Sequence, residues 1–260
     1  MASLTMQDGT RINYTVRGQG RPAFIFVHGW CSNLKHWDNQ ARYFGRNHRV
    51  LRLDRRGHGR SDVPAKGFTP RQHADDIAAV AGRERIRNAI VVGHAFGGPA
   101  TLQFARTYPQ FAKAVVLVDY GIAPKPAIGD PNDPFGTTLG GMIAALRGDD
   151  GRKALRGMYA GFFGPQADKR MVRQAIADAI KTPPEVAAAE LEGNAVDTAA
   201  IARRLRQPVL LITASPLDQP AMEATLKRVQ VGQVVGSGHF PQMEVPGQVN
   251  AMIESFAAQL

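Results

Sequence analysis

Short apolar runs and amphipathic stretches alternate along most of the chain. Arg11–Val16 alternates polar and apolar residues as an amphipathic strand does, and Ala23–Val27 is a continuous apolar run that suits a strand buried on both faces. His73–Ala81 carries apolar residues at helical spacing on one face. The alternation predicts an α/β fold, with a parallel sheet covered by helices on both faces. Further strands are predicted at Arg49–Leu53, Ala89–Val92, Ala114–Val118, Pro208–Ile212 and Val231–Val235, and further helices at Pro99–Tyr108 and Gln248–Gln259.

The pattern changes after Asp119. Residues 120–140 are rich in proline, glycine and aspartate, and helical segments then run from about Leu139 to Arg206 with no strand between them. We therefore predict one domain over residues 1–260, with a helical cap or lid inserted at 120–206 over one end of the sheet.

Composition narrows the class of protein. The chain has 260 residues, of which 44% are hydrophobic, so a disordered or collagen-like chain is excluded. No apolar run approaches the roughly 18 residues of a membrane span, and the first residues lack the features of a secretion signal. The single cysteine, Cys31, cannot form an internal disulfide. We expect a cytoplasmic protein without a membrane partner.

The charge balance is strongly basic, with 32 Lys and Arg against 22 Asp and Glu, a net charge of +10. Basic residues are scattered, and no aromatic residues interleave with them as a base-stacking surface would require. We interpret them as solvated helix faces and expect no nucleic-acid partner. The net positive charge then indicates at most a weak preference for anionic substrates.

The most specific motif is Val91–Gly98, where a predicted strand runs through a glycine-rich turn into a predicted helix. Gly93 and Gly97 flank Ala95 in the pattern Gly-x-Ser-x-Gly of a nucleophile elbow, with alanine at the serine position. The glycines are needed because the central residue adopts a strained backbone. The N–H of Phe96 opens the helix and favours a developing oxyanion.

Two other segments complete a candidate active site. His28-Gly29-Trp30 follows the buried strand, where the N–H of Trp30 would be a second oxyanion donor. His239 lies in the glycine-rich loop before the last helix, where a catalytic base would stand. A carboxylate must orient that histidine, and Asp119 and Asp218 both follow predicted strands.

With these motifs in this order, the whole chain resembles the α/β-hydrolase family. The resemblance also includes Arg56–Ser61, and it implies an eight-stranded, mostly parallel sheet with a helical lid over its carboxyl edge. The family's usual acid follows the Pro208–Ile212 strand in a Gly-x-x-Asp turn, but here Thr213–Asp218 lacks that glycine. Asp119 matches relatives that carry the acid after the strand following the elbow helix, and we favour it over Asp218.

Ala95 departs from the family pattern, because a methyl group cannot attack a carbonyl. The interpretation we favour is a Ser-His-Asp hydrolase of esters, lactones or similar acyl substrates, in an engineered inactive form that lacks its serine. Two other interpretations remain open. One is a non-catalytic ligand-binding protein of the same fold, and the other is a dioxygenase.

In the dioxygenase interpretation, the reaction requires a general base but no nucleophilic serine. The chain is similar to cofactor-independent dioxygenases that cleave a hydroxyquinolone ring with a His-Asp pair, in Gly29–Cys31, in Asp119 followed by Ala123–Pro126, and in His239–Pro241. It departs from them at Ser32 and Phe96, where they tend to have histidines.

The substrate is expected to be a small apolar or aromatic acyl compound. Candidate contacts adjoin the motifs: Trp30, His94, Phe96 and Phe240, although a structural role is favoured for His94. No histidine pair at helical spacing beside a carboxylate predicts a metal site, and no dinucleotide fingerprint is present, so we expect no metal and no cofactor.

Overall fold

The computed structural model describes residues 2–260, in which eight strands form one sheet in the order β1-β2-β4-β3-β5-β6-β7-β8. β1 and β2 pair antiparallel, β2 pairs antiparallel with β4, and all the remaining neighbours are parallel. The predicted eight-stranded, mostly parallel sheet is confirmed. The strands are β1 (Ala2–Thr5), β2 (Arg11–Arg17), β3 (Phe24–Val27), β4 (Val50–Leu53), β5 (Ala89–His94), β6 (Ala112–Val118), β7 (Val209–Thr213) and β8 (Val229–Gln233).

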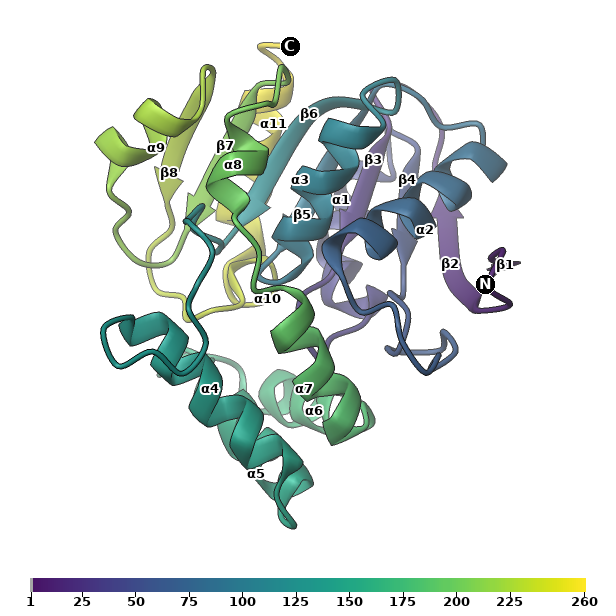
Figure 1. Cartoon of the computed structure of the whole chain (residues 1–260). Helices are drawn as coiled ribbons and strands as arrows, with labels where there is room; N and C mark the ends of the chain where they lie inside the picture. The colour runs from purple at the N-terminus through teal and green to yellow at the C-terminus, as the bar shows by residue number, and fades with distance from the viewer. Residues whose placement is uncertain (1) are drawn as a thin grey trace.

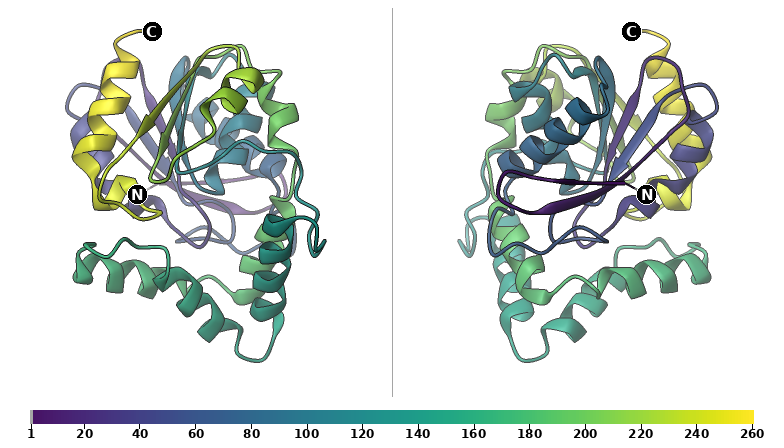
Figure 2. Two further views of the ribbon diagram at one scale, coloured as in Figure 1. Left: turned by 90° about the vertical axis from the view of Figure 1, so that its left-hand side faces the viewer. Right: turned by 90° about the vertical axis from the view of Figure 1, so that its right-hand side faces the viewer.

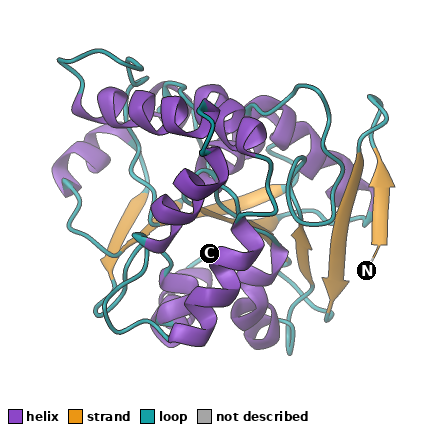
Figure 3. Cartoon of the chain, turned by 90° about the horizontal axis from the view of Figure 1, so that it is seen from below, coloured by secondary structure: helices purple, strands orange, loops and turns teal. Residues whose placement is uncertain are grey.

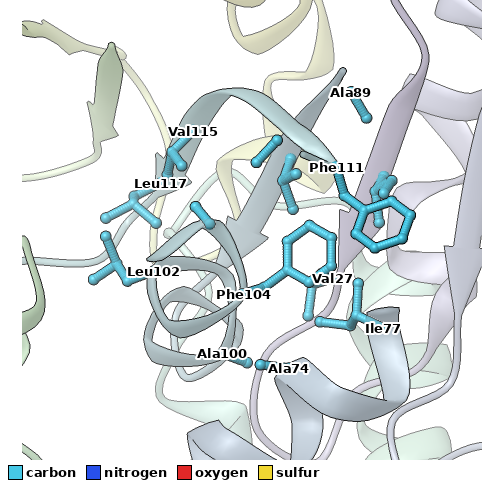
Figure 4. Packing of buried hydrophobic residues seen from close by; sticks show 14 of the residues in the cluster. Val27, Ala74, Ile77, Ala89, Ala100, Leu102, Phe104, Phe111, Val115 and Leu117 are labelled. Atoms are coloured by element: carbon cyan, nitrogen blue, oxygen red, sulfur yellow. The ribbon is translucent and has the colours of Figure 1, made fainter. Parts of the chain in front are cut away.

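One face of the sheet is covered by α2 (Pro70–Arg83), α3 (Gly97–Thr107) and α8 (Thr198–Ala202) (Figure 1). Ile77 of α2 and Phe104 of α3 pack with Val27 and Val115 from the strands in one apolar cluster (Figure 4). The central strands are buried on both faces, which explains their continuous apolar sequences.

The opposite face is covered by α1 (Asp38–Phe44) and α11 (Pro246–Ala257), which lie on the other side of the sheet in both views of Figure 2. Phe44, Ile253 and Phe256 from these helices pack with Phe26 and Val92 from the strands. Figure 3 shows helices on both sides of the twisted sheet, with β1 beside the N-terminus at its edge. This layering is the predicted one.

Four helices between β6 and β7 extend below the carboxyl ends of the strands (Figures 1 and 2). They share a third apolar cluster with Trp30, Cys31 and Phe240 of the loops below the sheet. α8 belongs instead to the cluster on the α3 face, through Ala199 and Ala202. The four helices are α4 (Pro134–Arg147), α5 (Gly151–Ala160), α6 (Lys169–Ala179) and α7 (Pro184–Gly193).

Several short elements were not predicted: β1, the 3₁₀ turn η1 (Leu34–Trp37), α1, α9 (Gln219–Thr225) and α10 (Pro241–Glu244). All of them have seven residues or fewer, too short for periodicity to stand out from the surrounding sequence. No helix within residues 2–260 is both long enough and apolar enough to cross a membrane.

Candidate active site

The turn between β5 and α3 has the backbone geometry expected of an elbow. Ala95 lies at φ +46°, the left-handed region that non-glycine residues rarely adopt. A Cβ at Gly93 would lie 2.4 Å from Thr101 Oγ1, and one at Gly97 would lie 2.6 Å from the carbonyl oxygen of His28. The glycines at both positions are therefore required by close packing around Ala95.

Two backbone N–H groups beside this turn have no acceptor. Within residues 2–260, neither the N–H of Trp30 nor that of Phe96 donates a hydrogen bond. The two segments are adjacent, because a Cβ at Gly29 would lie 3.1 Å from Cβ of Ala95. Because these N–H groups have no acceptor and lie next to the start of α3, they form a favourable environment for an anionic oxygen.

His239 and Asp119 are paired at the carboxyl edge of the sheet. His239 Nδ1 donates to Asp119 Oδ2 at 2.6 Å, with side-chain exposures of 32% and 18%. The other carboxylate oxygen of Asp119 accepts from the N–H of Ala214 at 2.8 Å, and the N–H of His239 donates to the carbonyl of Phe162 at 2.7 Å. With Nδ1 donating to the carboxylate, Nε2 of the neutral ring is the atom able to accept a proton.

The second candidate acid has a different role. Asp218 precedes α9, and its carboxylate accepts from the N–H of Ala221 at 3.1 Å as a helix cap. It lines the same cavity as Asp119 but forms no hydrogen bond with His239. The contacts therefore favour Asp119 as the partner of the histidine.

A carboxylate that the sequence reasoning missed holds the histidine loop. Glu244 accepts from the N–H groups of Gly238 at 3.1 Å and Phe240 at 3.2 Å, the two residues that flank His239. It also accepts from the N–H of Gly164, between α5 and α6, at 2.9 Å. An acidic residue in the first turn of a helix that begins at a proline was the available signal in the sequence.

The four predicted substrate contacts divide into two groups. Phe96 lines the cavity described below, whereas Trp30, His94 and Phe240 are buried beside it and are not among its lining residues. His94 Nε2 lies 2.6 Å from the carbonyl oxygen of His239, and burial, together with the nearby His239, holds the pKa of His94 well below its usual value. The favoured structural role of His94 thus agrees with its contacts.

A cavity of about 460 Å³ opens at Ala95 and His239. It contains no lysine or arginine, so the predicted preference for anionic substrates has no positive side chain behind it. Burial raises the pKa of Tyr120 in its wall to about 12, so this phenol stays neutral at pH 7. The lining residues are mostly apolar: Ala95, Phe96, Asp119, Tyr120, Gly121, Ile122, Ala123, Pro124, Pro126, Phe135, Leu139, Asn194, Val196, Thr198, Leu217, Asp218, Met222 and His239.

Sequence reasoning did not identify the segments that supply most of this lining. They are residues 120–126, 194–198 and 217–222, which include the starts of α8 and α9 and come together only when the sheet forms. No group of three or more His, Cys, Asp or Glu side chains in the described chain is arranged to hold a metal ion.

Comparison with known proteins identifies the family. A model of the alpha/beta hydrolase family matches residues 24–252. A non-heme chloroperoxidase of Streptomyces lividans is 40% identical over 122 residues, 45% of this chain and 44% of that protein. A bifunctional esterase/perhydrolase of Acinetobacter calcoaceticus is 37% identical over 121 residues, again 45% of this chain and 44% of the relative. The matched segments thus span less than half the length of these curated relatives.

The fold extends over the whole chain. The crystal structure of the enol-lactonase from Burkholderia xenovorans LB400 covers 99% of this chain and all of its own, with a TM-score of 0.86 and 19% identity. At that identity the likeness concerns the fold alone, whereas the family model covers most of the sequence. The chain therefore belongs to the alpha/beta hydrolase family.

Proposed function

We propose that this protein carries the machinery for hydrolysing a carboxylic ester or lactone by a Ser-His-Asp mechanism, with Ala95 in the position of the serine. The observation that supports this most directly is the pairing of His239 with Asp119 at the cavity that Ala95 also lines. The N–H groups of Trp30 and Phe96 beside the same turn have no acceptor within residues 2–260, as the donors of an oxyanion hole would.

With serine at position 95, the steps follow from these contacts. The serine oxygen attacks the substrate carbonyl as His239 Nε2 takes its proton, and Asp119 stabilises the imidazolium that forms. The N–H groups of Trp30 and Phe96 hold the oxyanion, and each such donor contributes about 3–4 kcal/mol. The imidazolium then protonates the leaving alcohol, and a water activated by His239 releases the acid and restores the serine.

In the chain with Ala95, this covalent route is closed. The alanine methyl has neither a proton to give up nor a lone pair to attack with, so no acyl-enzyme forms. The remaining parts still favour binding of an acyl compound, because the paired histidine and the oxyanion donors do not depend on the serine.

We further propose that α4–α7 act as a lid that sets substrate shape. Phe135 and Leu139 of α4 line the same cavity as Ala95 and His239. The mostly apolar wall, free of lysine and arginine, favours an uncharged apolar or aromatic acyl substrate. The acyl hydrolases among the relatives, an esterase and a lactonase by name, are consistent with this class.

The test is to install the missing hydroxyl. Ala95→Ser should raise the rate of p-nitrophenyl ester hydrolysis by several orders of magnitude over the original chain. The reason is that His239 and Asp119 act through the serine, so the triad works only when all three members are present. Ala95→Ser combined with His239→Ala is the matched control, and it should return the rate to background. Esters left untouched by a folded Ala95→Ser variant would contradict the proposal.

A second candidate is favoured by one observation: the His239–Asp119 pair is intact although the nucleophile is absent. In this case His239 would deprotonate a hydroxyquinolone, and the anion would react with O₂, open its ring and release carbon monoxide. The original chain should then consume oxygen with this substrate, and Ala95→Ser should matter little. A protein that only binds would do neither and would still gain thermal stability from its ligand.

A further inference from the structure

A fully buried group of charges joins α7 to the loops below the sheet. Glu190 of α7 and Arg55 are 0% and 1% exposed, and both terminal nitrogens of Arg55 bond to the carboxylate. Nε2 of His58 and Nε2 of His73 each lie 3.1 Å from it. Burial by itself would raise the pKa of Glu190, but the Arg55 guanidinium and a hydrogen bond from His73 hold that pKa well below its usual value, so the carboxylate is ionised.

The same guanidinium holds the loop that carries one of the proposed oxyanion donors. Arg55 Nη2 donates to the carbonyl of Gly29 at 2.7 Å. The backbone N–H of Arg55 donates to His28 Nε2 at 2.9 Å, which leaves His28 Nδ1 to donate to the same carbonyl at 2.8 Å. The peptide that joins Gly29 to Trp30 is therefore fixed at its oxygen, and its N–H belongs to Trp30.

The next two residues are held by the same assembly. Trp30 Nε1 donates to the carbonyl of Ala187 at 2.9 Å, one turn before Glu190 in α7. The N–H of Cys31 donates to His58 Nε2 at 3.2 Å. Cys31 lies at φ +48°, a conformation that persists only where the surroundings impose it.

We propose that Glu190 is a positioning residue which, through Arg55 and α7, fixes the Gly29–Cys31 loop so that the Trp30 N–H points at the substrate oxyanion. This inference rests on the proposed function. A buried ion pair adds little net stability, because removing both charges from water costs about as much as their attraction returns. Stability is therefore a weak explanation for this ion pair, whereas its contacts with three consecutive loop residues are a specific explanation.

The first test does not depend on activity. The chain has two tryptophans, and the Trp37 indole N–H is buried without a partner, so Trp37→Phe removes no hydrogen bond and leaves Trp30 as the reporter. In this background, Glu190→Gln keeps the side-chain shape but loses the charge. We expect a red shift of Trp30 emission and stronger acrylamide quenching in the folded protein. Glu192→Gln, which removes an exposed ion pair on the same helix, is the matched control and should change neither.

A second variant covers the possibility that Glu190→Gln does not fold. Arg55→Lys keeps a positive charge for Glu190 but loses the planar fork that also reaches the carbonyl of Gly29. It should give the same red shift and quenching. Folded variants that lose thermal stability while Trp30 emission stays unchanged would overturn the proposal, because Glu190 would then be merely structural.

The second test uses the Ala95→Ser background. There Glu190→Gln should lower kcat for p-nitrophenyl esters by about 10- to 100-fold with KM nearly unchanged, as expected when an oxyanion donor is displaced rather than removed. A rise in KM at constant kcat would contradict the role. If Ala95→Ser itself has no activity, the proposed function fails, while the fluorescence test still decides whether Glu190 holds the loop.

Discussion

Two aspartates line the cavity, and only one of them is bonded to the histidine. Asp119→Asn in the Ala95→Ser background should lower kcat by about 10³- to 10⁴-fold, because an amide would favour the wrong histidine tautomer and could not stabilise the imidazolium. Asp218→Asn is the matched variant, and kcat should be nearly unchanged because Asp218 caps α9. Steady-state kinetics with p-nitrophenyl esters measures both. A larger loss in the Asp218 variant would reverse the assignment.

Gly29 illustrates how closely the two halves of the site approach each other. A Cβ at this position would lie 2.7 Å from His94 Nδ1 and 3.1 Å from Cβ of Ala95. Gly29→Ala should therefore destabilise the protein by about 1–3 kcal/mol, as overpacking of a tight site does. Gly247→Ala, in the first turn of α11 and with nothing within 4 Å of the added atom, should not destabilise the protein and should stabilise it slightly, as alanine does in a helix. Urea unfolding compares the two, and equal midpoints would contradict the close packing.

At the scale of elements, α5 has an interior glycine at a position where alanine would fit. Gly157 lies inside α5, with nothing within 4 Å of where a Cβ would stand. Gly157→Ala should stabilise the protein by about 0.5–1 kcal/mol, because alanine loses less backbone freedom on folding. The urea midpoint should rise at constant slope. A fall in the midpoint would mean that α5 is packed against something at this position.

The main elements could be predicted because their apolar patterns are long and uninterrupted. The four central strands and α2, α3 and α11 bury whole faces, so burial dictates their sequences. The sequence favours Asp119 over Asp218 only through the family resemblance, because the contact itself depends on how the loops after β6 and β7 meet His239. Glu190 gave no sequence signal either, since a charged residue in an amphipathic helix normally faces water.

At the scale of the whole molecule, the charge and the site are separate. The +10 net charge suggested an anionic substrate, yet the cavity beside His239 contains no lysine or arginine. A second hollow, at the amino ends of β3, β5 and β6, is instead lined by five basic residues: Arg21, Arg49, Arg85, Arg87 and Lys113. Because parallel strands run from that edge to the one that carries Ala95, the two features lie at opposite ends of the sheet. The net charge of the chain therefore reflects basic residues elsewhere on the molecule and not the lining of the proposed substrate cavity.

The stability of the whole molecule should depend on four buried histidines. Burial lowers the pKa of His36 and of His73 to about 4, and it holds those of His28 and His94 well below the usual value. In the unfolded chain these rings titrate near pH 6.5. Between pH 6.5 and pH 4 the unfolded state therefore binds more protons than the folded state, and stability falls as the pH falls.

The magnitude makes this dependence easy to measure. At pH 5, His36 and His73 should each reduce the free energy of unfolding by on the order of 2 kcal/mol relative to pH 7.5, and His28 and His94 add to that loss. Urea unfolding at pH 7.5, 6.5, 5.5 and 5.0 gives the slope. Both ring nitrogens of His36 lack hydrogen-bond partners, so His36→Leu removes the titrating group without breaking a bond. Its slope should be shallower by up to one proton, because one fewer ring takes up a proton on unfolding. An unfolding midpoint that stays constant from pH 7.5 to 5.0 would mean that these rings are solvated in the folded protein, contrary to the packing that buries them.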